Sequence, residues 1–264
     1  MTEFTERYGP WAVVAGASDG TGEAFAEHLA ARGLKVVLVA RRQALLAEVA
    51  ARLPTESRVV VLDLASATAG ADLAAAVADL DVGLLIYNAG ADDHSTAFLE
   101  QPLADLDALV SRNCATVLQA CHRIGGRLVE RGGGGVILVS SGAAWAGGAN
   151  LAAYGATKAF DLILAEALWA EWRPRGVDVL ALVLGATDTP SLRRLLELRG
   201  GVLPKVAQPD DVVAEALDHL ADGPTWSMGM PDPEGSFPLG ALPRRQAVEL
   251  MTQMATAVHH PPPS

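Results

Sequence analysis

The feature that most constrains the fold of this chain is a regular alternation of short apolar runs with segments of helical periodicity. The apolar runs cover Trp11–Ala15, Lys35–Ala40, Val59–Leu62, Val82–Tyr87, Val136–Val139, Val177–Leu184 and Trp226–Met228. The helical segments cover Glu23–Arg32, Gln43–Leu53, Ala71–Ala78, Leu103–Glu130, Leu151–Trp172 and Asp210–Leu220. Apolar strands that alternate with helices are typical of a parallel sheet covered on both faces. We therefore predict an α/β fold: one doubly wound domain over residues 1–258 with about seven parallel strands, then a disordered tail over 259–264.

The charge of the chain limits its partners. The net charge is −11, and a nucleic acid or an anionic membrane surface would need a basic face. No apolar stretch approaches the roughly 20 residues that a membrane span requires. The N-terminal residues lack an apolar signal core, and Cys114 and Cys121 are two helical turns apart, too far for a disulfide. We therefore expect a cytoplasmic protein with no nucleic-acid partner, no membrane contact and no metal site.

A glycine-rich turn, Gly16-Ala17-Ser18-Asp19-Gly20-Thr21-Gly22, lies directly between the first apolar run and the first helix. Glycines at such a turn let the backbone approach a pyrophosphate, and the helix N-terminus favours its charge. The spacing is G-x-x-x-G-x-G rather than the commoner G-x-G-x-x-G. The turn therefore predicts a dinucleotide site, and the alternative interpretation is a structural turn without a ligand.

A second motif pairs Tyr154 with Lys158, downstream of Ser140 and Ser141. Residues four apart lie on the same face of a helix. An ammonium beside a phenol lowers the phenol's pKa from its reference of about 10, which gives a proton donor usable near neutral pH. The spacing alone is weak evidence, but a proton donor and a nucleotide turn on one domain predict hydride transfer to or from a carbonyl.

These motifs together resemble the short-chain dehydrogenase/reductase family. The resemblance rests on the glycine turn, on Tyr87-Asn88-Ala89-Gly90, on Ser141 and on the pair Tyr154 and Lys158, in order over residues 10–190. Ser141 lies 13 residues before Tyr154, which matches the family's spacing and selects it over Ser140. The resemblance implies a Rossmann fold that binds NAD(P)(H) and a homodimer or homotetramer assembled through the two longest helices.

The resemblance also implies the roles of a catalytic set. Tyr154 would protonate the substrate oxygen, and Ser141 would hold that oxygen by a hydrogen bond. Lys158 would bind the nicotinamide ribose and depress the pKa of the tyrosine. Asn113 would anchor a water in a proton relay to the lysine.

The expected cofactor is NADP(H) rather than NAD(H). The second apolar run ends in Ala40, which has no carboxylate to repel a phosphate, and Arg41 follows it. An arginine at this place accommodates a 2′-phosphate. The expected cofactor-binding residues are Gly16, Ser18, Asp19, Gly20, Thr21, Gly22, Arg41, Arg42, Asp63, Leu64, Asn88, Ala89, Gly90, Tyr154, Lys158, Gly185, Thr187 and Thr189. One departure is Leu184-Gly185, where the family usually has proline-glycine.

The expected reaction is the NADPH-dependent reduction of a ketone or aldehyde, or the reverse oxidation. Leucines in segment 190–208 suggest a hydrophobic or cyclic substrate and a lid over the site, the alternative being a fixed helix pair. The expected substrate contacts are Ser141, Ala143, Trp145, Tyr154, Gly185 and Leu192. Two other functions remain open: a non-catalytic NADP-binding sensor or regulator, and dehydratase or epimerase chemistry on nucleotide sugars.

Overall fold

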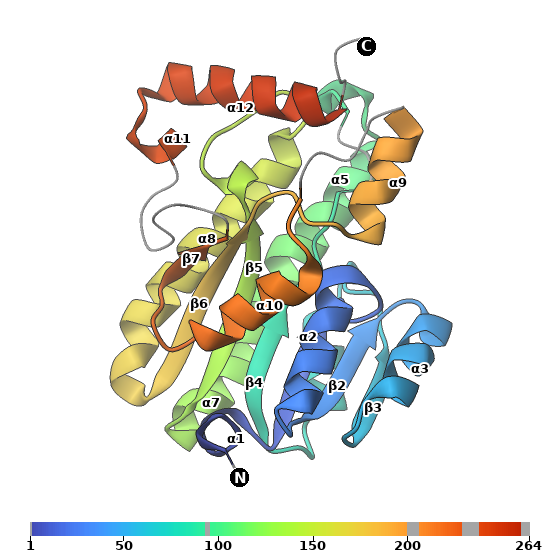
Figure 1. Ribbon diagram of the computed structural model, residues 1–264, viewed down its shortest axis with the longest axis vertical. Coiled ribbons are helices and arrows are strands. Elements are labelled where there is room, and N and C mark those ends of the chain that lie inside the picture. Colours follow the sequence, from blue (N-terminus) through green and yellow to red (C-terminus); the bar gives the residue numbers. More distant parts are fainter. Residues whose placement is uncertain (1, 93–95, 200–205, 229–237, 260–264) are drawn as a thin grey trace.

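A parallel sheet forms the centre of the molecule, as expected from the sequence. The computed structural model describes residues 2–92, 96–199, 206–228 and 238–259. In this part of the chain the strands are β1 Trp11–Ala15, β2 Lys35–Ala40, β3 Ser57–Val61, β4 Val82–Tyr87, β5 Gly134–Ser141, β6 Val177–Leu184 and β7 Thr225–Ser227. They form one seven-stranded sheet in the order β3-β2-β1-β4-β5-β6-β7, with every pair parallel (Figure 1). The predicted α/β doubly wound fold is confirmed.

Helices cover both faces of this sheet, which explains why its central strands are apolar throughout. The α-helices of the described residues are α1 Glu3–Tyr8, α2 Gly20–Ala31, α3 Gln43–Arg52, α4 Ala69–Ala76, α5 Leu103–Val110, α6 Thr116–Ala120, α7 Gly126–Arg131, α8 Ala152–Trp172, α9 Pro190–Arg199, α10 Pro209–Asp218, α11 Pro238–Ala241 and α12 Arg244–His259. Buried side chains of α2, α3 and α10 pack on one face, and those of α4, α6, α7 and α8 pack on the other.

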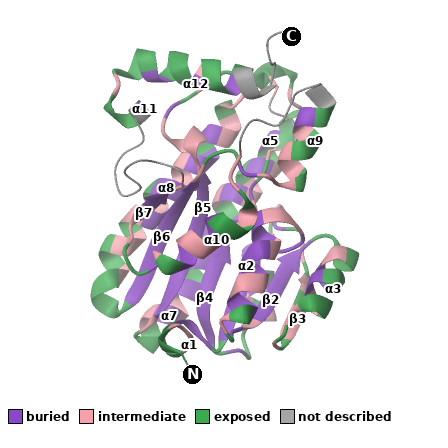
Figure 2. Cartoon of the chain, viewed as in Figure 1, coloured by how far each residue is buried: buried purple, intermediate pink, exposed green. Residues whose placement is uncertain are grey.

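Strand β1 shows how the two cores are divided. Ala12 and Val14 belong to the core under α2, whereas Val13 and Ala15 belong to the core under α8. All four side chains are 0% exposed, and Figure 2 shows the strands of the centre buried along their length. Among the described residues, none of the helices is both long and apolar enough to cross a membrane.

The structure corrects several expected boundaries. Strand β5 begins at Gly134 rather than Val136 and includes both serines, because its backbone pairs with β6 from Gly134 to Ser141. The helix expected over 103–130 is interrupted by two π-helical segments, Ser111–Ala115 and Cys121–Gly125. Such π-bulges reshape a helix locally and often occur at functional sites.

The C-terminal part of the chain contains a helix that the sequence analysis did not predict. Helix α12 lies across the carboxyl end of the sheet and continues to His259, the first residue of the expected tail (Figure 1). The rest of that tail, 260–264, lies outside the described residues.

The turn between β1 and α2 depends on glycine at two positions. Gly16 has a φ of +88°, in the left-handed region that favours glycine. A Cβ on Gly22 would lie 1.9 Å from the Gly16 carbonyl oxygen and 2.7 Å from Asn88 Nδ2. Asn88 Nδ2 also donates to the Gly16 carbonyl at 3.2 Å, so the turn is tied to the end of β4.

We predict that Gly22→Ala lowers the free energy of unfolding by about 1–3 kcal/mol or more, because the methyl group overpacks the turn. The matched control is Gly126→Ala in α7, where a Cβ would meet nothing within 4 Å. That change should be neutral or stabilise by about 0.4–1 kcal/mol, because alanine restricts the unfolded chain. Urea unfolding of both variants is the measurement, and equal stabilities would contradict the close approach at Gly22.

Candidate active site

A cavity of about 410 Å³ lies at the carboxyl end of the central strands. Parallel α/β sheets place their ligand sites at this edge. Its wall comes from the β1–α2 turn, from the ends of β4, β5 and β6, and from α8, α9 and α12. The wall includes these residues expected from the sequence: Asp19, Gly20, Thr21, Asn88, Gly90, Ser141, Ala143, Tyr154, Lys158, Gly185, Thr187, Thr189 and Leu192.

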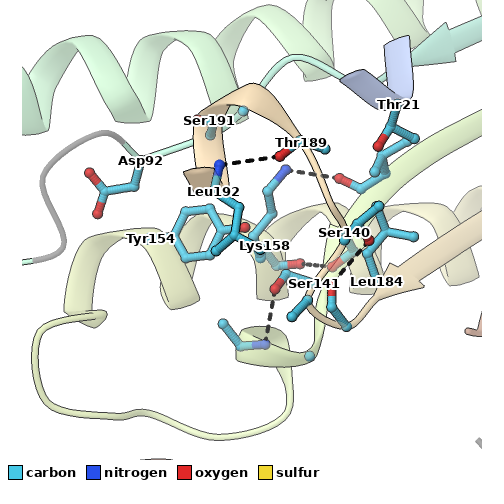
Figure 3. Close-up of a pocket in the computed structure, with 18 of the residues that line it drawn as sticks. Thr21, Asp92, Ser140, Ser141, Tyr154, Lys158, Leu184, Thr189, Ser191 and Leu192 are labelled. Atoms are coloured by element: carbon cyan, nitrogen blue, oxygen red, sulfur yellow. Dashed lines mark hydrogen bonds between the residues drawn. The ribbon is translucent and has the colours of Figure 1, made fainter. Parts of the chain in front are cut away.

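Three groups of the expected catalytic set meet at this cavity (Figure 3). Ser141 is the last residue of β5, and its Oγ accepts from the Ala143 amide at 3.3 Å. Tyr154 and Lys158 project from the first turns of α8. The neighbouring Ser140 is 2% exposed, and its Oγ donates to the Lys158 carbonyl at 2.8 Å. Ser140 therefore links α8 to β5 through its hydroxyl. The Ser141 hydroxyl does not take part in this link.

Asn113 lies behind the cavity rather than on its wall. It is 0% exposed within the π-helical segment Ser111–Ala115. Its Nδ2 donates to the Gly90 carbonyl at 3.1 Å and to Thr157 Oγ1 at 3.0 Å. Asn113 therefore connects the loop after β4 with α8, at the turn that carries both Tyr154 and Lys158.

Sequence reasoning missed a buried carboxylate, Asp161. Its Oδ2 accepts from Lys158 Nζ at 3.1 Å, and both side chains are 4% exposed. Burial raises the pKa of Asp161 to about 6, while the Lys158 ammonium acts in the opposite direction. The spacing of three residues from Lys158 places both groups on one helix face and is the signal that would have revealed this pair.

The environment of the two cysteines favours their protonated thiol form. Burial raises the pKa of Cys114 to about 11 and that of Cys121 to about 12. Both thiols are free. Among the described residues there is no cluster of ligands that could hold a metal ion.

The opposite side of the glycine turn holds a second hollow of about 300 Å³. Arg42 lines it and donates to Ser18 Oγ and to Asp19 Oδ2, both at 2.7 Å. Asp19 is the N-cap of α2, yet its side chain makes no cap hydrogen bond, so the first amides of α2 are not capped by it. Arg41 is exposed and has no hydrogen bond or ion pair to the described residues.

Several expected site residues do not reach the cavity. Asp63 is exposed and accepts from the Ala65 amide at 3.0 Å, and Leu64 is buried with its carbonyl bonded to Thr116 Oγ1 at 2.8 Å. Trp145 packs against the cluster that holds α12, because its carbonyl and ring face that helix. The residues Gly16, Ser18, Gly22, Arg41, Arg42 and Ala89 flank the site without lining the larger cavity.

The apolar part of the wall comes largely from elements late in the chain. Leu192 and Leu195 of α9 line it, and α12 adds Met251, Met254 and Ala255. Segment 190–199 is helical, and residues 200–205 lie outside the described part of the chain, so a mobile lid over 190–208 stays a prediction. The contribution of α12 was missed because nothing local in its sequence links it to a site about a hundred residues earlier in the chain.

The sheet order, the glycine turn and the cavity define a dinucleotide-binding oxidoreductase of the Rossmann class. The family model described as short chain dehydrogenase matches residues 10–199. The chain belongs to the short-chain dehydrogenase family, and it is an NAD(P)-dependent enzyme that interconverts alcohols and carbonyl groups.

Individual relatives agree with this assignment. A 7beta-hydroxysteroid dehydrogenase of Collinsella aerofaciens is 35% identical over 225 residues, which cover 81% of this chain and 84% of that protein. A structure from work on 7beta-hydroxysteroid dehydrogenase stereoselectivity matches with a TM-score of 0.82 and 30% identity, over 95% of this chain and 99% of the other. A short-chain dehydrogenase from Sphingobium yanoikuyae in complex with NADPH matches with a TM-score of 0.74 and 29% identity, over 84% and 90% of the two chains.

We predict that the buried carboxylate makes the fold less stable as the pH rises. The pKa of Asp161 is raised from 3.8 to about 6 in the folded protein, so the native state binds more protons than the unfolded state between these values. The free energy of unfolding should fall from pH 4 to about pH 6, by on the order of 2–3 kcal/mol from this group. Urea unfolding of the wild type and of Asp161→Asn across this range measures it; parallel pH dependences would contradict the assignment.

Proposed function

We propose that this enzyme reduces a hydrophobic or cyclic ketone or aldehyde with NADPH, or catalyses the reverse oxidation. The observation that carries the proposal is the meeting of Ser141, Tyr154 and Lys158 at one cavity of about 410 Å³ whose outer wall is apolar. This combination suits a substrate with one polar reacting group on an apolar body.

The proposed roles follow from the donors at this cavity. The Tyr154 hydroxyl donates the proton to the substrate oxygen, and the Ser141 hydroxyl donates a hydrogen bond to the same oxygen. Donors already in place stabilise the negative charge that develops on this oxygen. The Lys158 ammonium would hold the nicotinamide ribose and would offset the negative charge left on Tyr154 after it gives up its proton. Asn113 acts indirectly, because its bonds to Gly90 and Thr157 fix the helix turn that carries both side chains.

The residues present fit a dinucleotide. Gly16 and Gly20 have φ values of +88° and +57°, and the N-terminus of α2 faces the cavity without a side-chain cap. Exposed amides at a helix N-terminus favour a pyrophosphate. When bound, the reduced nicotinamide supplies a hydride to the carbonyl carbon. Asn88, Gly90, Thr187 and Thr189 would contact the cofactor along the strand ends.

The preference for NADPH rests on the cations beside the turn. Arg42 is already bonded to Ser18 and Asp19, whereas Arg41 has no such partner in the described structure. We assign the 2′-phosphate to Arg41, with Ser18 and Arg42 forming the floor of that site. A guanidinium with unused donors binds a phosphate strongly.

The substrate class follows from the apolar wall and from the relatives. Leu192, Leu195, Met251 and Met254 offer flexible and branched apolar surface, and methionine adapts its shape to bulky ligands. The named relative acts as a 7beta-hydroxysteroid dehydrogenase, so a steroid ketone belongs in the first substrate panel. Such a panel, followed by the loss of NADPH absorbance, tests the proposed reaction; no turnover of any bulky carbonyl would refute the substrate class.

A homodimer or homotetramer is part of the proposal. Large apolar side chains are exposed on the helices expected to pair and on the short helical turn Phe98–Glu100 that precedes the first of them. They are Phe98, Leu99, Leu103, Val110, Leu118 and Ile163, with Leu99 94% exposed. Exposed apolar residues gathered on adjacent elements suit a contact between subunits.

Arg41→Ala should reduce the ratio of NADPH affinity to NADH affinity by about tenfold, because the variant loses a charge-assisted contact that only the 2′-phosphate makes. Titration by fluorescence measures both affinities. The matched control is Arg175→Ala, which makes the same change in net charge at an exposed residue beside the opposite edge of the sheet. An unchanged ratio in Arg41→Ala, or an equal change in the control, would remove the assignment.

Tyr154→Phe should lower turnover by on the order of 10² or more, because a positioned general acid contributes that much. The ring remains, so folding and nucleotide affinity should stay close to those of the wild type. Steady-state rates on a carbonyl from the panel and nucleotide titration are the two measurements. A variant that keeps most of its turnover would show that another group donates the proton.

A further inference from the structure

Asp161 is a buried ion that lines neither the cavity nor the nucleotide turn. It lies three residues after Lys158 on α8, and its Oδ2 accepts from Lys158 Nζ at 3.1 Å. Each side chain is 4% exposed. The charged unit beneath Tyr154 is therefore a lysine–aspartate pair rather than a lysine alone.

The surroundings of Asp161 do not favour a carboxylate. The groups that face it from neighbouring elements are Tyr87 of β4 and the thiols of Cys114 and Cys121 in the two π-helical segments, all uncharged. Its second oxygen, Oδ1, is buried and has no hydrogen-bond partner within the described part of the chain. A buried carboxylate with one polar partner reduces stability, and an apolar side chain of similar size would pack here at less cost.

The benefit of the Asp161 carboxylate is to the position of Lys158 rather than to the stability of the fold. Lys158 Nζ donates to the Val139 carbonyl at 2.8 Å and to Asp161, so two of its three hydrogens are fixed. The atom lies next to Gly90, where an added Cβ would be only 2.6 Å away. The Asp161 carboxylate forms a charge-assisted hydrogen bond that fixes the direction of the ammonium.

We propose that Asp161 is the positioning residue for Lys158, and that its carboxylate holds the ammonium aimed at the cavity. The inference rests on the roles proposed above for Tyr154 and Lys158. It adds that nucleotide binding and proton donation both depend on a buried ion pair, and therefore on the charge of a residue that touches neither substrate nor cofactor.

The pair makes the site sensitive to mild acid. Burial raises the pKa of Asp161 to about 6, so the carboxylate is lost as the pH falls through that value. Lys158 is the charged group that faces Asp161, and Tyr87, Cys114 and Cys121 stay neutral because burial raises their pKa values well above this range. Below about pH 6 the wild type should therefore behave like a variant that has no charge at position 161.

The decisive comparison is between the wild type and Asp161→Asn, which keeps the shape and removes the charge. At pH 8 the variant should lose roughly tenfold or more in turnover with NADPH, because the ammonium is no longer held in place. Its affinity for NADP⁺, measured by quenching of tryptophan fluorescence, should fall severalfold. The ratio of wild-type to variant turnover and the ratio of their affinities should both approach one at pH 5, because the Asp161 carboxylate of the wild type is then protonated. Because both proteins are measured with the same nucleotide, the titration of its phosphate affects them equally and cancels in these ratios.

The matched control is Glu171→Gln, which removes one negative charge from an exposed residue of the same helix. It should equal the wild type at every pH. An Asp161→Asn variant that equals the wild type at pH 8 would overturn the proposal. A variant impaired by the same factor at all pH values would also overturn it, because that is the result of a purely structural role.

A second measurement covers the case in which Asp161→Asn does not fold. The affinity of the wild type for NAD⁺, which has no phosphate monoester, should weaken as the pH falls from 8 to 5, and an unchanged affinity contradicts the proposal. A wild type that binds nicotinamide nucleotides but reduces no carbonyl would refute the proposed function. The pH dependence of NAD⁺ affinity would still test the role of Asp161. A wild type that binds no nucleotide at all would refute both.

Discussion

The burial of both faces of the parallel sheet determines where this protein can place the polar groups of its candidate active site. Strands β1 and β4 are buried at every position, so they have no side available for a reacting group. Polar side chains that line the cavity come instead from the carboxyl ends of strands, such as Asn88 after β4 and Ser141 in the last position of β5. Because parallel strands end at one edge, these groups meet there without any further folding element. The position of the active site is thus a consequence of the packing of the core.

The turn of α8 that carries Tyr154 and Lys158, the proposed reacting groups, is joined to that edge by hydrogen bonds. Ser140 donates to the Lys158 carbonyl, Lys158 donates to the Val139 carbonyl, and Asn113 joins the loop after β4 to Thr157. Asn113 itself lies buried within the π-helical segment Ser111–Ala115, a local departure from regular helix geometry of a kind that often occurs at functional sites. The same helix turn therefore carries the reacting side chains and the contacts that hold them.

Much of this arrangement could be predicted from the sequence because it depends on local patterns. Apolar runs gave the strands, and the spacing of Ser141, Tyr154 and Lys158 placed three groups that the structure brings to one cavity. Asp161 was missed because its meaning depends on which face of α8 is buried, and a chain of mixed alanine and leucine around it leaves that face undefined. The sequence also could not show that Arg42 is engaged by other described residues whereas Arg41 is not. That difference depends on the hydrogen bonds that Arg42 makes across the turn to Ser18 and Asp19.

Helix α12 completes the apolar wall from the far end of the described chain, while the nucleotide turn and the proton donor lie in earlier segments. The groups to which we assign the reaction and this part of the apolar wall thus come from separate segments of the sequence. During synthesis, the sheet and the nucleotide turn emerge from the ribosome before this helix exists. Under the proposed function, substitutions on the inner face of α12 would reshape the apolar wall while leaving Ser141, Tyr154 and Lys158 in place.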